Sequence, residues 1–476
     1  MTAPEFAVVG RVNKGKSSII ATLAENDQIA ISPLPGTTRR CRRYPVIVDD
    51  ETLFVLVDTP GFEDAASVLS WLKEAEVTAD QREARVHAFV AAHQSSSDFV
   101  EECELLRPIL EGALILYVVD GTKPYRENYQ TEMEILRWTG RPSMALINRI
   151  GDEDHSSTWR RALDQYFKVV RDFDAHSASF SERMKLLSTF KELEPQLETN
   201  LARAIDALKQ ERERRRAEVV HIISRLLLEC LTFTLEATDS ERQQPHKLEQ
   251  EFHEHLRKRE EKARLEVETL YRHHHVNWQH AGELDRPIFG EDLFAKKTWR
   301  VLGLSPGQLV TLYTVSGAVA GSVLDASVGG SSFLAGTAIG AAMGAGAGML
   351  HLQRRLAKAT SLDGLSSRFR RAFSSEARVR VGPFKHPNFP FVLLDRALLH
   401  YDAVRTRAHA RNSTEQGNLR LEGALATALD RSERQKLHRV FERLRKEGPD
   451  PKPGTLDALY KAIRARVRQV GQDEAA

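Results

Sequence analysis

Cysteine is scarce in this chain, and its few cysteines follow no spacing that would indicate a site. Cys41, Cys103 and Cys230 lie far apart in a sequence of 476 residues. Neither a zinc site nor a redox pair has such spacing, so we interpret them as free thiols in a reducing compartment. The sequence also lacks the basic region and long apolar core of a secretory signal near its first residues. We therefore expect a cytoplasmic protein, or one held to a membrane from the cytosolic side.

An excess of charge of one sign is missing as well. The chain holds 68 Lys and Arg against 66 Asp and Glu, which gives a formal net charge of +2. This balance does not by itself indicate a nucleic-acid partner, so RNA is neither predicted nor excluded. Hydrophobic residues make up 41% of the chain, enough to bury a sizeable core. The length indicates several domains.

Residues 1–180 are expected to form the first domain, in which short apolar runs alternate with helical patterns. Runs of this kind predict a mostly parallel sheet with helices on both faces, an α/β fold. A long polar, mostly helical segment separates Gly61 from Leu114. The strand candidates are Phe6–Val9, Leu53–Val57, Leu114–Val119 and Met144–Ile147.

The rest of the chain divides by composition into three parts. Residues 181–290 are long, charged and helical, and residues 361–476 are mixed but mainly helical. The run Lys209–Arg216 indicates either an exposed helix with local ion pairs or a basic RNA-binding helix. His273, His274, His275 and His280 lack carboxylates or cysteines at ligand spacing, so we interpret them as a helix end rather than a metal site.

Residues 291–360 are expected to form an apolar helical hairpin. Between Arg300 and Arg354 the only formally charged side chain is Asp325. At about 1.5 Å per residue, two helices here would reach most or all of a hydrocarbon core of about 30 Å. Small residues recur every four positions, at Gly317 and Gly321 and then at Gly336, Gly340, Gly344 and Gly348, which indicates a glycine zipper.

Residues 10–17, Gly-Arg-Val-Asn-Lys-Gly-Lys-Ser, fit the phosphate-binding pattern G-x-x-x-x-G-K-[ST]. They follow an apolar strand candidate and precede a helical stretch, Ser18–Ala24, which is the context that the pattern requires. Lys16 is expected to reach the β- and γ-phosphates, and Ser17 to hold Mg²⁺. The nucleotide-binding residues predicted here are Gly10, Asn13, Lys14, Gly15, Lys16, Ser17 and Ser18.

A second motif, Asp58-Thr-Pro-Gly61, ends the strand candidate Leu53–Val57. An acidic residue at this place binds Mg²⁺ through water, and the backbone N–H of Gly61 is placed to donate to a γ-phosphate. The same four residues would otherwise be an ordinary turn. Their position after a strand and downstream of a phosphate-binding loop favours the functional interpretation.

These two motifs and Pro35-Gly-Thr-Thr-Arg39 resemble the TrmE–Era branch of bacterial P-loop GTPases, over roughly the first 180 residues. In particular they resemble its group with a long C-terminal region of unknown function. The resemblance implies GTP and GDP as ligands, and Thr38 as the switch I residue that closes on Mg²⁺ and the γ-phosphate. It implies a catalytic set of Lys16, Thr38 and Gly61. Asn13 matches the asparagine that helps coordinate K⁺ in the potassium-activated members.

Three departures from the family pattern stand out, and one is in switch I, where Arg39-Arg40-Cys41-Arg42-Arg43 replaces the usual Thr-Arg-Asp. Phe62 occupies the place of a catalytic glutamine, so K⁺, a remote carboxylate or a partner must support hydrolysis. Where Asn-Lys-x-Asp should read the base, the chain has Asn148-Arg149-Ile-Gly with Asp152 one place late. Either Asp152 reaches the guanine through a bulged loop, or guanine selectivity is weakened. Ser177 and Ala178 are candidates for the base-contacting Ser-Ala loop.

Taken together, the sequence predicts a GTP-hydrolysing switch of low intrinsic rate that is associated with the cytosolic face of the inner membrane. Lys296, Lys297 and Arg300 precede the hairpin, and Arg354, Arg355 and Lys358 follow it, so both its ends should be cytosolic. Two alternatives remain open: a soluble Era-like factor for RNA or ribosome assembly, and a dynamin-like membrane remodeller. A protein effector and a GTP-dependent homodimer are further expected partners. The segment between Gly61 and Leu114 would be an enlarged switch region or an inserted effector surface.

Overall fold

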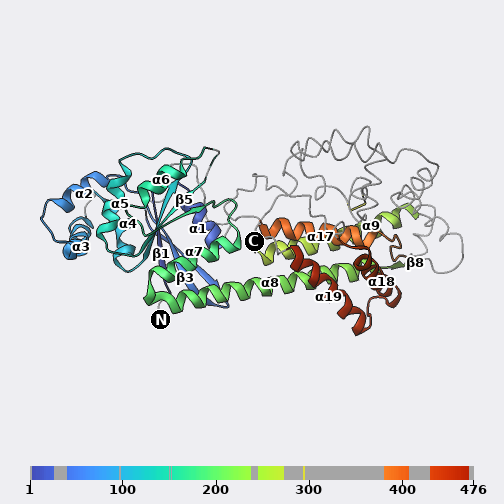
Figure 1. The fold of residues 1–476 in the computed structure, drawn as a ribbon. Coiled ribbons are helices and arrows are strands. Elements are labelled where there is room, and N and C mark those ends of the chain that lie inside the picture. Colours follow the sequence, from blue (N-terminus) through green and yellow to red (C-terminus); the bar gives the residue numbers. More distant parts are fainter. Residues whose placement is uncertain are drawn as a thin grey trace, which may run out of the picture.

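A computed structural model describes residues 3–25, 40–95, 98–149, 151, 153–236, 245–272, 293–294, 380–406 and 429–470. Its N-terminal part is an α/β domain around one sheet, and its C-terminal part is a bundle of helices. One long helix joins the two parts (Figure 1). The expected α/β domain followed by a helical region is therefore confirmed.

The α/β domain contains a six-stranded sheet in the order β2-β3-β1-β4-β5-β6, and only β2 runs antiparallel to its neighbour. Hydrophobic runs give the parallel strands their burial on both faces: Phe6 and Val8 point to one helical layer, Ala7 and Val9 to the other. The strands are β1 (Glu5–Val9), β2 (Arg42–Val48), β3 (Glu51–Asp58), β4 (Leu114–Asp120), β5 (Ser143–Asn148) and β6 (Val169–Phe173).

Strands β2 and β3 form a hairpin that the sequence analysis did not anticipate. Asp49 and Asp50 connect the two strands, and both have positive φ angles, 48° and 61°. Two residues with positive φ make the tight turn that matches the twist of paired strands, and Asp tolerates this conformation better than most residues. The hairpin brings Arg42 opposite Asp58, at the edge of the sheet nearest the phosphate-binding loop.

Helices cover both faces of this sheet. On one face lie α1 (Lys16–Ala24), α7 (Phe180–Leu193) and the first turns of α8 (Glu198–Thr232). On the other face lie α2 (Ala65–Lys73), α3 (Arg82–His93), α4 (Val100–Leu110), α5 (Tyr129–Trp138) and α6 (Ser156–Leu163). The core of the domain thus continues past residue 180, because α7 and Leu201, Ala204 and Ile205 of α8 pack against the sheet.

In the polar segment between Gly61 and Leu114 the structure describes three α-helices and one short 3-10 helix, Ala79–Gln81. Helix α4 contacts β1 and directly precedes β4, whereas α2 and α3 lie at the outer end of the domain (Figure 1). An aromatic cluster ties them together: the rings of Phe89 and Trp71 are 5.4 Å apart, and Phe99 is 5.4 Å from Phe89. Arg85 stacks over Trp71 at 3.6 Å from the ring centre.

The helical region consists of the part of α8 from Val219 onward, with α9 (Pro245–Leu270), α17 (Phe389–Thr406), α18 (Arg431–Glu447) and α19 (Pro453–Val470). A short two-stranded sheet, β7 (Leu235–Glu236) with β8 (Arg380–Val381), joins segments that are far apart in the sequence. These elements share one hydrophobic core, separate from the two cores of the α/β domain.

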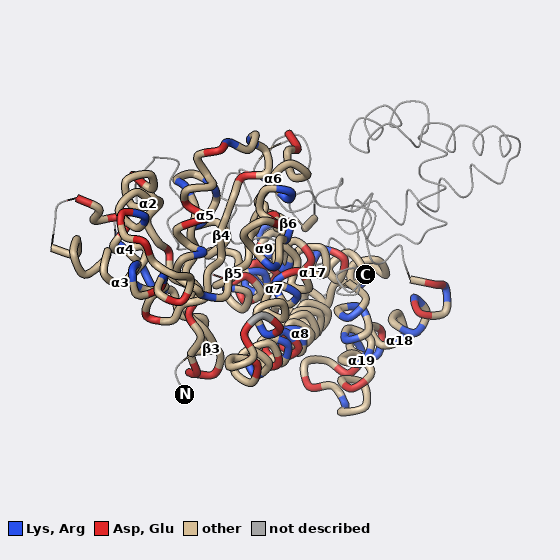
Figure 2. Tube along the Cα trace, turned by 60° about the vertical axis from the view of Figure 1, so that its left-hand side comes forward, with Lys and Arg blue, Asp and Glu red and all other residues tan. Residues whose placement is uncertain are grey.

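Helix α8 is 35 residues long and continuous through both regions. Acidic and basic residues occur along its turns (Figure 2). Its buried residues recur at three- and four-residue spacing, which places them along one stripe of the helix. The first turns of the stripe face the sheet and the later turns face the helical region.

Several expectations fall on residues outside the described ranges. They are the hairpin of residues 301–353, the histidines His273, His274, His275 and His280, and the site residues Thr38 and Asp152. These expectations stay predictions. Among the helices that the structure does describe, none combines the length and apolar character needed to span a membrane.

Candidate functional site: the phosphate-binding loop and its surroundings

The phosphate-binding loop connects β1 to α1 and is shaped by two backbone requirements. A Cβ at Gly10 would lie 2.3 Å from the carbonyl oxygen of Val118, so only glycine fits against β4 there. Gly15 has φ 85° and lies directly before the first residue of α1. Between them Asn13 also has a positive φ, 60°. Backbone N–H groups in such alternating conformations converge, and together with the helix N-terminus they form an anion-binding loop.

Lys16 projects into this loop and is nearly buried, with 9% of its surface exposed. Its Nζ donates to the carbonyl oxygen of Gly10 at 2.7 Å and to that of Arg11 at 3.1 Å. Burial lowers the pKa of Lys16 below its ordinary value, while the negative charges of Asp58 and Glu132 act in the opposite direction. The ammonium group is thus held at the loop, where phosphate oxygens would replace the carbonyl oxygens as its partners.

Ser17 and Asp58 meet at the ends of α1 and β3. The Ser17 hydroxyl donates to Oδ2 of Asp58 at 3.3 Å, and Asp58 is buried. The residue after Asp58, Thr59, is held in place by its hydroxyl, which donates to the carbonyl oxygen of Val8 at 2.8 Å. A hydroxyl and a carboxylate oxygen at this spacing suit Mg²⁺, which takes a few protein oxygens and completes its shell with water and phosphate. In the described part of the chain, no group of three or more His, Cys, Asp and Glu side chains could hold a metal ion.

Gly61 lies beside the phosphate-binding loop, as the motif predicts. A Cβ built on Gly61 would be 3.4 Å from the carbonyl oxygen of Gly10 and 3.5 Å from the backbone nitrogen of Val12. The following side chain, Phe62, packs against the core on the face of the sheet that α2 to α6 cover. A phenylalanine in this position cannot orient a water molecule.

Glu102, a residue that the sequence analysis did not select, holds the segment after Gly61. It lies in α4 and is 2% exposed. A single carboxylate oxygen, Oε1, accepts the backbone N–H groups of Glu63 at 2.9 Å and of Asp64 at 2.7 Å. Two residues later along α4, Glu104 accepts the backbone N–H of Cys41 at 3.3 Å. Helix α4 therefore contacts the start of β2 and the loop after β3 at the same time.

Behind the loop lies a second network that the motif did not indicate. Arg11 pairs with Glu132 of α5, and its guanidinium lies 4.1 Å from the ring centre of Tyr129. The hydroxyl of Tyr117 donates to Oε2 of Glu132 at 2.9 Å. Burial raises the pKa of Glu132, although its contacts with Arg11 and Tyr117 oppose that shift. The network fastens the first turn of the loop to β4 and α5.

On the side where a base would bind, Asn148 links two loops. Its Nδ2 donates to the carbonyl oxygen of Lys14 at 3.2 Å, and its Oδ1 accepts the N–H of Ala175 at 3.3 Å. The Nζ of Lys14 lies 3.4 Å from Oδ2 of Asp120. Arg149 turns away to Asp154, at 2.7 Å between mostly exposed side chains. Asn148 and Lys14 are thus brought together, and Arg149 is not part of that contact.

The Ser-Ala pair lies farther along the loop between β6 and α7. The Ser177 hydroxyl donates to Asp174 at 2.6 Å, and Ala178 packs against the core beneath α7. The residue that contacts Asn148 is Ala175, two residues after the end of β6, and the sequence analysis missed it. Ser18, the last residue of the predicted loop set, is buried in α1.

Comparison with known proteins divides the chain in a similar way. The family model described as "50S ribosome-binding GTPase" matches residues 5–149. The family model described as "Domain of unknown function (DUF3482)" matches residues 160–467, which is more than half of the chain. The α/β domain is thus a P-loop GTPase domain, and the second family model covers most of the helical region.

Individual relatives match the α/β domain. GTPase Der of Syntrophotalea carbinolica is 27% identical over 167 residues, 34% of this chain and 32% of the relative. A GTP-binding protein EngB of Acidobacterium capsulatum is 30% identical over 152 residues, 31% of this chain and 61% of the relative. The tRNA modification GTPase MnmE of Pseudothermotoga lettingae is 26% identical over 153 residues, 32% of this chain and 26% of the relative. The chain therefore spans less than two thirds of the length of each of these relatives.

Among solved structures, Era of Aquifex aeolicus bound to GDP.AlF4- is 21% identical to this chain. It covers 37% of this chain and 52% of its own, with a TM-score of 0.24. The family models and the relatives are consistent with the TrmE–Era resemblance that the three motifs carry.

Proposed function

This chain belongs to the family described as "Domain of unknown function (DUF3482)" and carries an N-terminal P-loop GTPase domain, and from that premise we propose that it is a GTP-hydrolysing molecular switch. The observation that carries the proposal is the convergence of Lys16, Ser17, Asp58 and Gly61 at one loop, with Ser17 and Asp58 3.3 Å apart. Its output is passed to the helical region through α8.

In this proposal the chain's own groups position and stabilise, and water is the nucleophile. Lys16 and the loop N–H groups bind the β- and γ-phosphates, while Ser17, Thr38 and Asp58 are the residues that would hold Mg²⁺. When bound, Mg²⁺ neutralises part of the phosphate charge. Water attacks the γ-phosphorus, the bond to the β–γ bridging oxygen breaks, and GDP and phosphate result. Donors fixed before the reaction stabilise the charge that develops on the phosphate oxygens.

Potassium dependence is part of the proposal, with Asn13 as the candidate K⁺ ligand. The support for it is the P-loop asparagine, its positive φ angle, and the replacement of the catalytic glutamine by Phe62. A cation bound there would supply positive charge beside the phosphates, where no glutamine follows Gly61. A GTP-dependent homodimer would be one way to complete the cation site.

The test is turnover by the purified full-length chain with Mg²⁺ and either KCl or NaCl at equal ionic strength. We expect slow GTP hydrolysis that is at least several-fold faster in K⁺, and faster turnover of GTP than of ATP. Equal rates in the two salts would exclude Asn13 as a cation ligand. Equal turnover of GTP and ATP would show that Asp152 does not read guanine. No hydrolysis and no nucleotide binding would contradict the proposed function.

We further propose that the switch acts at the cytosolic face of the inner membrane through residues 301–353. The support is their composition, with one charged side chain between Arg300 and Arg354 and basic residues on both flanks. The test is fractionation of the full chain and of a chain lacking residues 301–353, followed by a carbonate wash. Extraction-resistant full chain with a soluble deletion variant supports the proposal, and two soluble forms contradict it.

A ribosomal role is the second candidate function. The family model that matches residues 5–149 is described as a 50S ribosome-binding GTPase, and this match favours the ribosome over other RNA. Cosedimentation of the full chain with ribosomal subunits, with GDP or a non-hydrolysable GTP analogue, tests this candidate. Binding that depends on the nucleotide would support it, and the absence of the chain from the subunit fractions would reject it.

A further inference from the structure

Helix α1 connects the phosphate-binding loop to a polar contact at its other end. Lys16 and Ser17 form its first turn, and Glu25 follows its last residue. Along a nine-residue helix, the rise is about 1.5 Å per residue, so Glu25 lies on the order of 13 Å from the loop. Every residue of α1 except Ser17 is buried, and a packed helix of this length moves as a rigid unit. A displacement of Glu25 would therefore also displace Lys16 and Ser17.

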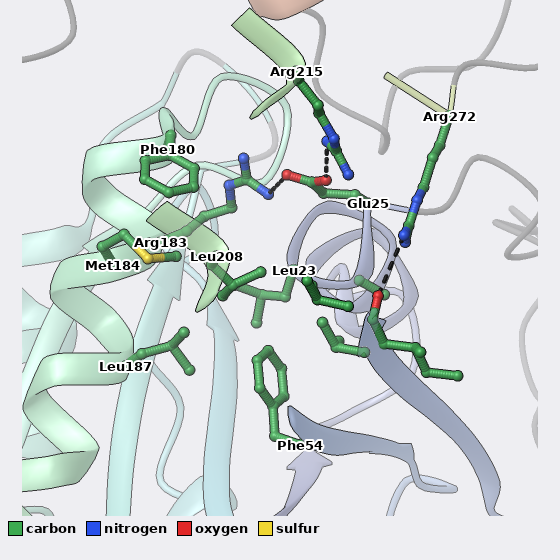
Figure 3. Close-up of a pocket in the computed structure, with 14 residues that line it drawn as sticks. Leu23, Glu25, Phe54, Phe180, Arg183, Met184, Leu187, Leu208, Arg215 and Arg272 are labelled. Carbon is green, nitrogen blue, oxygen red and sulfur yellow. Dashed lines mark hydrogen bonds and ion pairs between the residues drawn. The ribbon is translucent and has the colours of Figure 1, made fainter. Parts of the chain in front are cut away.

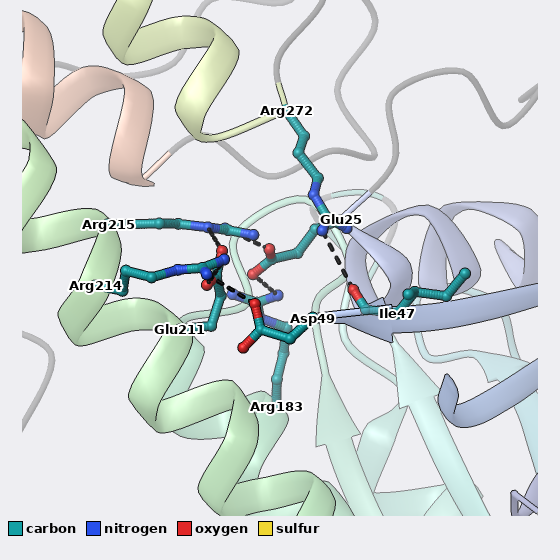
Figure 4. Close-up of polar contacts among 8 residues, drawn as sticks. All are labelled: Glu25, Ile47, Asp49, Arg183, Glu211, Arg214, Arg215 and Arg272. Carbon is teal, nitrogen blue, oxygen red and sulfur yellow. Dashed lines mark hydrogen bonds and ion pairs between the residues drawn. The ribbon is translucent and has the colours of Figure 1, made fainter. Parts of the chain in front are cut away.

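Two arginines from different helices hold Glu25, as Figure 4 shows. Nη1 of Arg183, in α7, donates to Oε1 at 2.7 Å, and Nη1 of Arg215, in α8, donates to Oε2 at 2.6 Å. The side chain of Arg215 is 7% exposed and that of Glu25 is 16% exposed. The Nε of Arg215 also donates to Glu211, one turn earlier in α8, at 2.9 Å.

The setting of this contact is apolar, which strengthens it. Figure 3 shows Leu23, Phe54, Met184, Leu187 and Leu208 lining the same pocket as Glu25, where α1, β3, α7 and α8 meet. Ion pairs out of water are screened less than surface pairs, and removing one partner leaves the other charge uncompensated. Arg215 lies on the buried stripe of α8, between Ile205 and Val219, at a position where the helix otherwise carries apolar residues.

Further contacts reach the β2–β3 hairpin from the same side. Nη2 of Arg272, after α9, donates to the carbonyl oxygen of Ile47 at 3.3 Å. Arg214 pairs with Asp49 at 2.7 Å, but both side chains are mostly exposed. The helical side of the molecule thus contacts both α1 and β2, the two elements that border residues 26–39 in the sequence. Of these contacts, the Arg215 pair is the buried one.

We propose that Arg215 is a positioning residue for the nucleotide site, acting through Glu25 and α1 on Lys16 and Ser17. The inference rests on the proposed GTP hydrolysis and adds a residue from outside the GTPase motifs to it. Because α8 continues into the helical region, the same contact makes phosphate binding and the position of that region dependent on each other. Such coupling is reciprocal: a change at α8 alters the nucleotide site, and bound nucleotide alters α8.

The first test compares Arg215→Met with wild type in the full-length chain. Met keeps most of the apolar stem but removes the guanidinium. We expect kcat for GTP to fall about tenfold and KM to change less than about threefold, because loop and base contacts remain while phosphate positioning suffers. Arg215→Lys should recover part of the loss. The matched control is Arg214→Met, the neighbouring exposed arginine, which should change kcat by less than about twofold.

A double-mutant cycle decides whether Arg215 acts through Glu25. Glu25→Gln keeps the shape of the side chain and removes its charge. If the pathway is right, Arg215→Met has little further effect in the Glu25→Gln background, so the two losses are strongly non-additive. Independent, multiplying losses in kcat would overturn the inference. So would an Arg215→Met variant that has a lower Tm but wild-type kcat and KM well below that temperature, because that result describes a purely structural contact.

A second readout separates this inference from the proposed function. Hydrogen exchange of the α8 amides around Arg215 is measured with and without Mg²⁺ and GDP. We expect GDP to slow exchange there in wild type and not in Arg215→Met. If the wild type binds GDP but does not hydrolyse GTP, the proposed hydrolysis falls and the exchange result alone decides the inference. Exchange in α8 that GDP leaves unchanged in the wild type would overturn the coupling.

Discussion

The α/β domain and the helical region both bury charged residues, but the surroundings of these residues differ. In the α/β domain, Lys16 and Asp58 are buried beside the phosphate-binding loop. In the helical region, Glu260 pairs with Arg396 and Glu268 with His400 between α9 and α17, inside the shared core. These two contacts fasten α9 to α17.

This difference shows why burial of a charge does not by itself identify a site. Lys16 lies where a helix begins and Asp58 where a strand ends, so a ligand can exchange for their protein partners. Glu260, Arg396 and His400 lie in the interior of two packed helices. Desolvation lowers the pKa of His400 although Glu268 favours its charged form, so the histidine tends to be a neutral partner in the core.

The largest expected effect is a loss of stability in the helical region. In Glu260→Ala, Arg396 loses both of its contacts with Glu260, one of them 3.2 Å from Nη2 to Oε2. Breaking a buried pair on one side costs about 3–5 kcal/mol. We expect the free energy of unfolding of the helical region, measured in urea, to fall by about 3–5 kcal/mol. The control is Glu254→Ala, whose pair with Arg257 is exposed and should cost less than about 1 kcal/mol.

The next largest effect is a loss of GTP hydrolysis in the α/β domain. Lys16→Ala removes the ammonium group that meets phosphate, so GTP hydrolysis should fall by about 10²-fold or more. Stability should hardly change or should rise, because burial of the ammonium lowers its pKa and therefore opposes its charged form. Steady-state phosphate release and thermal unfolding check the two halves of the prediction. Hydrolysis at the wild-type rate in this variant would show that Lys16 does not act in the nucleotide site.

A smaller effect tests whether a buried carboxylate of the α/β domain acts on the site or only on packing. Glu102→Ala leaves the N–H groups of Glu63 and Asp64 without their shared acceptor. We expect kcat to fall about tenfold and stability to fall by about 1–3 kcal/mol. Glu102→Gln keeps an acceptor oxygen and should stay near wild type. A loss of stability with unchanged kcat would make Glu102 a packing residue like Glu260.

The smallest effect concerns pH. Burial raises the pKa of Glu132 in the folded protein, which therefore holds this proton more tightly than the unfolded chain does. Its contribution to the free energy of unfolding is favourable below the unfolded pKa and is lost as pH rises through the folded one. Glu132→Gln should make stability less dependent on pH as the pH rises above the ordinary glutamate pKa of 4.5. The exposed Glu127→Gln serves as the control, and identical pH profiles in all three proteins would contradict the assignment.

Much of the α/β domain could be predicted from sequence, because its signals are local. The loop of residues 10–17 and the motif of residues 58–61 each follow an apolar run, and the structure places both at strand ends. Strands β2 and β6 are both absent from the sequence candidates, and for β2 the cause is different. Arg42, Arg43 and Pro45 interrupt its hydrophobic pattern, and its edge position leaves one side unpaired, so its pairing with β3 decides its structure.

The parts of the site that the sequence did not indicate depend on contacts between distant residues. Glu102 is separated from Asp64 by 38 residues, and Arg215 from Glu25 by 190. No local pattern distinguishes Arg215 from its neighbours in the run Lys209–Arg216, and the reading of that run as an exposed helix is wrong for Arg215. Ala175 likewise became visible only through its contact with Asn148.

The single buried stripe of α8 has a consequence for how the length of this chain can vary. Each inserted residue turns the following part of an α-helix by about 100°. One extra residue between Ile205 and Val219 would rotate the later apolar residues out of the helical core, or Leu201 away from the sheet. Insertions of three, four or seven residues nearly restore the phase. Natural relatives that lengthen this helix should therefore do so in whole turns.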